Sequence, residues 1–198
     1  IRWWQMGMDG AALGDKVDKL FAAVDQVRAV LERYVPAPQM AIPWSGRDAF
    51  PNDNPALNGI TFTVDHDDES ETARLIDSYR SMGFDRVSAY VPPLPAVSYA
   101  RVSRLGEWTR RMLVARHAGA DAVFVPQTWT ARATLAGVVT EPTEEFVVYR
   151  TVVGLVGDAH PGPRLELGEG VRCLAFYSGA TAVLALWDET AGEDGREV

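Results

Sequence analysis

The chain has 198 residues, of which 47% are hydrophobic and 23% are charged, a composition typical of globular proteins with a substantial core. A net charge of -8 and the lack of a Lys/Arg cluster predict that it does not bind nucleic acid. No apolar run approaches the ~20 residues that cross a bilayer, so no membrane contact is expected. A single Cys excludes an internal disulfide, and the cellular location stays open.

The first part of the chain alternates strand and helix patterns. Residues 2–10 resemble a strand, and apolar residues at helical spacing predict an amphipathic helix over residues 17–34. A short strand is expected at Gln39–Trp44 and another at residues 59–64. Between them, residues 45–58 are rich in Pro, Asn, Asp and Gly, which predicts a long loop.

The alternation continues through the middle of the chain. Asp68, with Glu71 three residues later, forms a capping-box signal for a helix that ends before Gly83. The elements that follow are a strand over residues 86–91, a helix over residues 98–118 and a strand over residues 121–125. A strand, helix, strand order of this kind is typical of a parallel α/β protein.

The last part of the chain changes pattern. Pro142 lies near the first turn of a predicted helix, and residues 171–177 and 181–187 form two strands joined through Ser178 and Gly179. That spacing predicts an antiparallel hairpin. We therefore divide the chain into two domains, residues 1–160 and residues 161–198.

Two α/β architectures fit the first domain, a doubly wound sheet and part of a (β/α)8 barrel. The glycines after the first strand do not match the phosphate-binding spacing of a doubly wound nucleotide binder, which favours the barrel. A complete barrel needs ~250 residues. The predicted fold is the C-terminal part of a TIM barrel, with about five parallel strands and their helices, followed by a hairpin that begins a β-sandwich. The N-terminal half of the barrel, roughly three βα units, is the missing partner.

Polar and aromatic residues follow the predicted strands, at the end where parallel α/β proteins bind ligands. These residues are Trp44, Asp65, Tyr90, Gln127 and Trp129. Core packing alone could account for the presence of either Trp. Both Trp44 and Trp129 lie among polar residues in the sequence, however, which favours a place in a ligand pocket. A Trp face can stack on the apolar face of a sugar ring, so we predict a carbohydrate ligand.

Residues 4–9 read Trp-Gln-Met-Gly-Met-Asp. This segment resembles the Trp-x-x-Gly-Asn-Glu motif on the fourth strand of the retaining glycoside hydrolases of the large (β/α)8 clan typified by cellulases and β-xylosidases. The resemblance implies that Asp9 is the general acid/base, that Trp4 and Trp129 contact sugar, and that residues 184–188 open a C-terminal β-sandwich.

The chain departs from that family where the nucleophile is expected. The seventh strand of the family ends in a Glu, whereas residues 88–92 read Ser-Ala-Tyr-Val-Pro. Retaining hydrolysis needs two carboxyl groups ~5 Å apart. Asp65 could supply the second one, in which case the protein is a glycoside hydrolase. Alternatively, the site binds carbohydrate without cleaving it, and Asp9 only closes a turn.

No metal or cofactor is expected. The acidic cluster at residues 65–68 is explained by helix capping, since Asp68 precedes a helix. The open strand edges at residues 2–8 and 121–125 predict a chain that is marginally stable or self-associating on its own.

Overall fold

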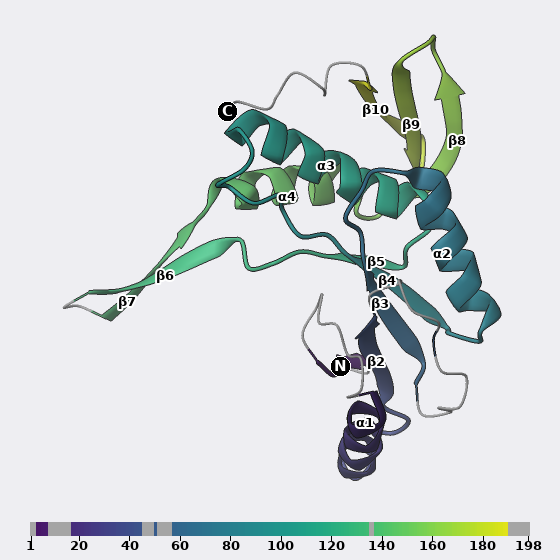
Figure 1. Cartoon of the computed structure of the whole chain (residues 1–198), viewed down its shortest axis with the longest axis vertical. Coiled ribbons are helices and arrows are strands. Elements are labelled where there is room, and N and C mark those ends of the chain that lie inside the picture. The colour runs from purple at the N-terminus through teal and green to yellow at the C-terminus, as the bar shows by residue number, and fades with distance from the viewer. Residues whose placement is uncertain (1–2, 8–16, 45–49, 51–56, 135–136, 190–198) are drawn as a thin grey trace.

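The computed structural model describes residues 3–7, 17–44, 50, 57–134 and 137–189 of the chain. Five parallel strands lie side by side in chain order and form a curled sheet (Figure 1). They are β1 (Trp3–Gln5), β2 (Gln39–Trp44), β3 (Gly59–Thr63), β4 (Arg86–Tyr90) and β5 (Ala122–Phe124). A doubly wound sheet reverses its strand order, whereas barrel strands follow one another without reversal. The strand order is therefore compatible with part of a barrel.

Four helices connect and cover the strands: α1 (Val17–Leu31), α2 (Glu69–Ser81), α3 (Arg101–His117) and α4 (Glu144–Val156). All four predicted helices are present, with ends that differ by a few residues. The predicted N-cap of α2 is confirmed, because the Asp68 carboxylate accepts hydrogen bonds from the backbone N–H groups of Ser70 and Glu71. Gly83 follows this helix at a φ of 92°, a left-handed conformation that favours glycine.

One face of the parallel sheet packs against the helices and forms the main core. Alternate residues of the three central strands supply its side chains: Met40, Ile42, Ile60, Phe62, Val87 and Ala89. Val24, Ile76 and Met112 come from the helices. Full burial of a large apolar side chain contributes ~1.5–3 kcal/mol. This face therefore supplies much of the stability of the sheet.

The opposite, inner face of the sheet carries the intervening residues and is more polar. Thr61 and Ser88 are in register on neighbouring strands and are both buried. The Thr61 hydroxyl donates a 2.8 Å hydrogen bond to the Gln5 side chain. Trp3 lies on the same face, with the Arg86 guanidinium 5.1 Å from the centre of its ring. The inner face of a (β/α)8 barrel is filled by side chains in this way.

A second sheet contains three antiparallel strands in the order β10, β9, β8: β8 (His160–Glu166), β9 (Val171–Ser178) and β10 (Thr181–Asp188). The predicted hairpin is confirmed, and Gly179 takes a φ of 58° in its turn. The sequence did not predict β8. Its pairing with β9 shifts register between Pro161 and Arg164, which interrupts the strand pattern.

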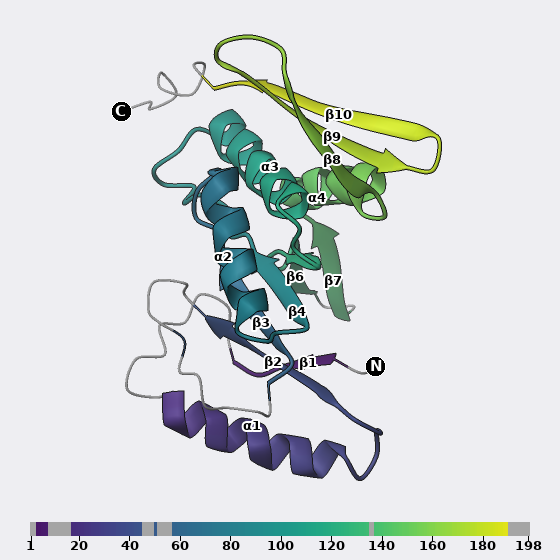
Figure 2. The ribbon, with the colours of Figure 1, turned by 90° about the vertical axis from the view of Figure 1, so that its right-hand side faces the viewer.

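The antiparallel sheet packs on the far side of the helices. Leu174 and Phe176 of β9 are fully buried against Leu113 and Val114 of α3. Figure 2 shows α3 and α4 between this sheet and the parallel one. The helical layer therefore joins the two sheets. No second sheet faces β8–β10 within the described residues, and the β-sandwich remains a prediction.

A two-stranded arm projects from the body of the protein (Figure 1). It consists of β6 (Trp129–Thr134) and β7 (Gly137–Pro142), paired antiparallel, and every residue of both strands is exposed. The sequence did not predict this arm. It lies between β5 and α4, in the position of a βα loop.

Candidate functional site at the carboxyl-terminal edge of the sheet

The carboxyl-terminal ends of β3, β4 and β5 share one edge of the parallel sheet. Thr63 is in register with Tyr90, and Tyr90 with Phe124. The ladder continues one residue further, because the Val64 N–H donates to Tyr90 O and the Val91 N–H donates to Phe124 O, both at 2.9 Å. Asp65 follows Val64 directly. The structure therefore places two of the predicted site residues, Asp65 and Tyr90, on neighbouring strand ends.

Asp65 forms part of an acidic loop with an imidazole beside it. The Nε2 atom of His66 lies 3.7 Å from an Asp65 carboxylate oxygen and 3.4 Å from a Glu71 carboxylate oxygen. The Asp65 side chain is 54% exposed, so a ligand can reach it. Asp68 has a different role, because its hydrogen bonds with the start of α2, chiefly with the Glu71 N–H, hold the pKa of its carboxyl below the usual value. Asp68 is structural and Asp65 faces solvent.

Two buried donors on α3 hold this edge in place. The Trp108 indole N–H donates to Val91 O at 2.8 Å, and the Arg111 guanidinium donates to Val64 O at 3.2 Å. Both side chains are almost fully buried. Trp108 and Arg111 are three residues apart and so lie on one face of the helix. They bond to the carbonyls that follow β4 and β3, where the strand ladder ends.

Arg111 is also a buried cation beneath the acidic loop. Burial lowers the pKa of its guanidinium, while the carboxylates of Glu107, Asp65 and Asp67 oppose that shift. The Glu107 carboxylate lies 3.6 Å from Arg111 Nε. An arginine remains charged even when buried. The loop that carries Asp65 is therefore fixed both by a hydrogen bond and by charge. Sequence reasoning missed Trp108 and Arg111, although their spacing on the apolar face of α3 was a possible signal.

Gln127 and Trp129 lie where the arm begins. The Gln127 side-chain amide donates to Trp129 O at 2.7 Å. Thr143, at the other end of the arm, donates from its N–H and from its hydroxyl to Thr128 O, both at 2.9 Å. The Trp129 side chain is 48% exposed. The base of the arm is thus held by hydrogen bonds while an aromatic face stays accessible.

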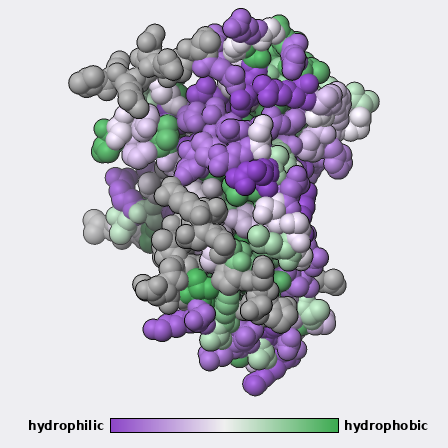
Figure 3. Space-filling view, turned by 45° about the vertical axis from the view of Figure 1, so that its right-hand side comes forward, coloured by the Kyte–Doolittle hydropathy of each residue, from purple (hydrophilic) through white to green (hydrophobic). Residues whose placement is uncertain are grey.

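Ion pairs fasten the elements next to this base. Arg104 and Arg101 of α3 pair with Glu144 of α4, and Arg104 also pairs with Glu145. These ion pairs therefore join the N-terminal turn of α3 to the N-terminal turn of α4. Figure 3 shows hydrophilic side chains predominating over the upper part of its view, where Figure 1 places α2, α3 and the antiparallel sheet.

Two predicted sugar-contacting residues are located elsewhere. Trp44 is only 6% exposed and packs edge-on against Phe50, with ring centres 4.9 Å apart. Trp4 packs against the same helix-covered core. Strand residues alternate between the two faces, so both side chains point away from the inner face of the sheet. Trp44 is therefore a buried packing residue and Trp4 a partly buried one, and contact of either with sugar remains a prediction. Asp9 lies outside the described residues, and its distance from Asp65 remains a prediction.

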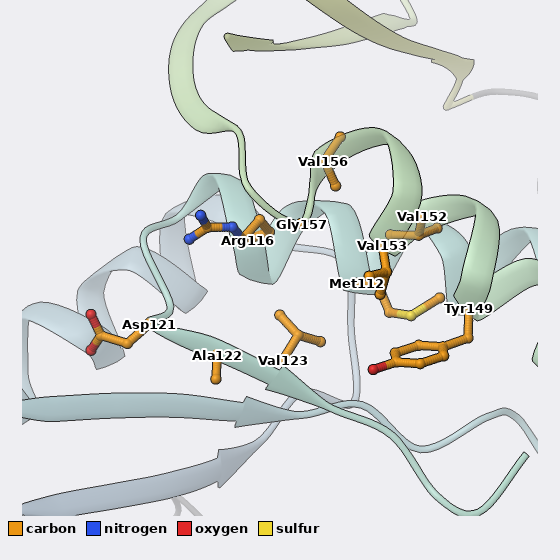
Figure 4. A pocket seen from close by; sticks show the side chains of 10 residues that line it. All are labelled: Met112, Arg116, Asp121, Ala122, Val123, Tyr149, Val152, Val153, Val156 and Gly157. Atoms are coloured by element: carbon orange, nitrogen blue, oxygen red, sulfur yellow. The ribbon is translucent and has the colours of Figure 1, made fainter. Parts of the chain in front are cut away.

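The main pocket of interest lies away from the carboxyl-terminal edge. It has a volume of about 240 Å³ and is bounded by β5, α3 and α4 (Figure 4). Its two charged residues already have structural partners. Asp121 accepts from the Val87 N–H at 2.8 Å, and Arg116 donates to Ala159 O at 2.8 Å. The rest of the lining is mainly apolar, so the pocket is a packing surface and offers little chemistry.

Within the described residues, no three His, Cys, Asp or Glu side chains are grouped so that they could hold a metal ion. None of the described helices is long and apolar enough to span a membrane. Comparisons with protein-family models, with curated proteins and with solved structures gave no match to this chain.

Proposed function

We propose that the chain is the C-terminal part of a (β/α)8 barrel that binds carbohydrate at the carboxyl-terminal edge of its strands. The observation that carries the proposal is the sequential parallel order of β1 to β5. In barrels with this order, ligands bind at the carboxyl-terminal ends of the strands and contact the βα loops. Asp65, Tyr90 and the arm all belong to that end of the sheet.

The edge offers the kinds of side chain that bind sugars. The half-exposed ring of Trp129 provides a flat apolar surface for a pyranose face, and Gln127 and Tyr90 provide polar groups for hydroxyls. The exposed carboxylate of Asp65 accepts hydrogen bonds from sugar hydroxyls. We therefore assign the sugar-contacting role to Tyr90, Gln127 and Trp129.

In the proposed hydrolase, two carboxyl groups act on opposite sides of the anomeric carbon. Asp9 protonates the departing glycosidic oxygen as the bond to the anomeric carbon breaks, and Asp65 attacks that carbon to form a glycosyl ester. Water, deprotonated by Asp9, then releases the sugar and regenerates Asp65. The buried Arg111 supports this role by position, because its hydrogen bond to Val64 O holds the backbone directly before Asp65.

A second candidate function is carbohydrate binding without cleavage. The observation that favours it is the end of β4, where Tyr90, Val91 and Pro92 stand and no carboxylate follows the strand. Among the parallel strands β1, β3, β4 and β5, whose following residues the structure describes, only β3 has an acidic residue within two positions of its end. Under this alternative the same residues bind sugar and Asp65 serves as a hydrogen-bond acceptor.

The two functions separate in one set of measurements. Calorimetric titration with xylo- and cello-oligosaccharides tests binding, and release of nitrophenol from aryl β-xylosides and β-glucosides tests cleavage. Trp129→Ala should weaken binding by about two- to tenfold, since an aromatic contact contributes ~0.5–1.5 kcal/mol. Tyr34→Ala, at an aromatic residue 80% exposed and far from the edge, is the control.

Asp65→Asn distinguishes the hydrolase from the binding protein. In the hydrolase it abolishes nitrophenol release while oligosaccharide binding persists. The matched control is Asp85→Asn, at an exposed carboxylate just before β4, on the opposite edge of the sheet. Binding without any cleavage by the parent protein supports the second candidate. Neither binding nor cleavage with any of these sugars contradicts the proposal.

A further inference from the structure

One peptide group in the loop before α2 is held at both of its ends. Its carbonyl oxygen, Asp67 O, accepts a 2.7 Å hydrogen bond from the Arg172 guanidinium. Its N–H, that of Asp68, donates to Nδ1 of His66 at 3.3 Å. Arg172 belongs to β9 and lies 105 positions away from Asp67 in the chain. The antiparallel sheet therefore contacts the loop that carries Asp65.

Arg172 is itself held in place by the antiparallel sheet and the residue that follows it. Its guanidinium lies 5.8 Å from the centre of the Trp187 ring and forms an ion pair with the Glu189 carboxylate. The Arg172 side chain is only 15% exposed. A guanidinium positioned by an aromatic ring and a carboxylate loses little further freedom when it binds a third group. Arg172 is therefore a pre-positioned donor to Asp67 O.

The bond from the Asp68 N–H decides which nitrogen of the His66 ring carries the proton. Nδ1 accepts this hydrogen bond, so it has no proton of its own, and the neutral ring is protonated at Nε2. Nε2 lies 3.4 Å from a Glu71 carboxylate oxygen and 3.7 Å from an Asp65 carboxylate oxygen. The ring therefore presents an N–H group, and not a lone pair, to the carboxylate of Asp65.

Asp65 lies between two arginine donors that act through the backbone. Arg111 donates to Val64 O, directly before Asp65, and Arg172 donates to Asp67 O, two residues after it. The first donor comes from α3 and the second from β9. The position of the Asp65 carboxylate therefore depends on both the helical layer and the antiparallel sheet.

We propose that Arg172 and His66 are positioning residues for Asp65, through which the antiparallel sheet completes the carbohydrate site. Arg172 orients the peptide between Asp67 and Asp68, and the N–H of that peptide orients the imidazole. The Nε2–H group of the imidazole then directs the Asp65 carboxylate. Proteins often fix an imidazole in this way, by a bond to the nitrogen that faces away from the functional group. The inference rests on the proposed role of Asp65 in the site.

NMR of the unliganded protein tests the arrangement without any sugar. At pH ~8, where an imidazole is ordinarily neutral, we expect the ring ¹⁵N signals of His66 to show protonation at Nε2 alone. Arg172→Met should give a mixture of the two ring forms and speed amide exchange at Asp68 by at least about tenfold. Arg172→Lys keeps a donor and should restore part of the protection. The control is Val183→Ala, which loosens the same sheet at a partly buried residue of β10 and should have neither effect.

Kinetics test the role of the two residues in the proposed hydrolase. Arg172→Met and His66→Ala should each lower kcat for nitrophenol release by at least about tenfold and change KM by less than about threefold. The reason is that a misplaced carboxylate slows attack more than it weakens binding. The double variant should be no slower than either single variant, since both act through one chain of hydrogen bonds. In the binding protein, the same variants weaken oligosaccharide binding, again without additivity.

The proposal is overturned if Arg172→Met leaves the His66 ring and the Asp68 amide unchanged. It is also overturned if Val183→Ala reproduces these effects, or if the two losses of kcat add in full. Failure of the proposed function gives a different result. In that case no sugar is bound or cleaved, while the NMR effects of Arg172→Met still appear and support the positioning of Asp65.

Discussion

The central strands of the parallel sheet and the two strands of the arm are both held by backbone hydrogen bonds between strands. The central strands have a buried face, whereas the arm is exposed on both faces. Strands β2 to β4 are covered by helices on one face, and Ile60, Phe62 and Val87 there are at most 1% exposed. Strands β6 and β7 form six cross-strand pairs, yet all twelve residues are exposed. An isolated two-stranded hairpin is only marginally stable in water, whereas a sheet that packs one face against helices is stable. The comparison separates the part of the molecule that holds the fold from the part that is available to ligands.

The largest expected effect is at the core of the parallel sheet. Phe62→Ala removes a ring that is 1% exposed and packs near Tyr79, so it should lower the free energy of unfolding by ~3–5 kcal/mol. Val138→Ala on the arm should change it by less than ~0.5 kcal/mol. Chemical denaturation of both variants checks the contrast. Equal losses at the two positions would show that the arm is part of the cooperative core.

The next effect concerns the buried cation at the edge of the sheet. Arg111→Met removes the hydrogen bond to Val64 O and leaves Glu107 beside an apolar side chain. We expect a loss of about 2 kcal/mol, because the buried Val64 O loses a charged donor, while Glu107 keeps its 2.8 Å ion pair with Arg110. The neighbouring Arg110→Met, which alters a more exposed pair with Glu107, should cost under ~1 kcal/mol. Similar costs for both variants would contradict the structural role of Arg111.

A smaller, pH-dependent effect joins α2 to α3. The His117 ring bonds to the Glu69 carboxylate and lowers the pKa of that carboxyl. A carboxyl with a lowered folded-state pKa stabilises the protein above its unfolded-state pKa, and this contribution is lost as the pH falls through the folded-state value. Glu69→Gln should therefore cost about 1 kcal/mol at pH 7 and progressively less in acid. Urea denaturation at pH 7 and below pH ~4 measures this, and a cost independent of pH would contradict it.

The smallest effect is expected on the polar face of the arm. Arg132 and Glu141 lie 3.6 Å apart and are both more than half exposed. Surface pairs of this kind contribute ~0–1 kcal/mol and are screened by salt. Glu141→Gln should leave the melting temperature unchanged within error at 0.5 M salt. A clear drop would indicate that the arm is packed against another surface.

The alternation of strands and helices was readable from the sequence because it depends on local patterns. Asp68 predicted the start of α2, and the turn at Gly179 predicted the β9–β10 hairpin. The arm was not predicted, since its alternation of small and polar residues gives a weak strand signal with no buried face. Strand β8 was missed because Pro161 and Gly162 interrupt its pattern.

The candidate site was only partly predictable for a geometric reason. Sequence spacing shows that Trp3 and Trp4 point to opposite faces of their strand, but it does not show which face the helices cover. The structure puts Trp4 toward the core and Trp3 on the inner face beside Arg86. The support of the Asp65 loop by Arg111 joins residues 46 positions apart, which no local pattern reveals.

The central claim is that sugar binds at the carboxyl-terminal edge of the parallel sheet. Titration of the isotopically labelled protein with xylo- and cello-oligosaccharides, followed by NMR, tests it most directly. The account predicts that amide and side-chain signals of Asp65, Tyr90, Gln127 and Trp129 shift with saturation, while those of Val153 and Leu155 stay unchanged. Shifts confined to Val153 and Leu155 of α4, or no shifts with any of these sugars, would contradict the account.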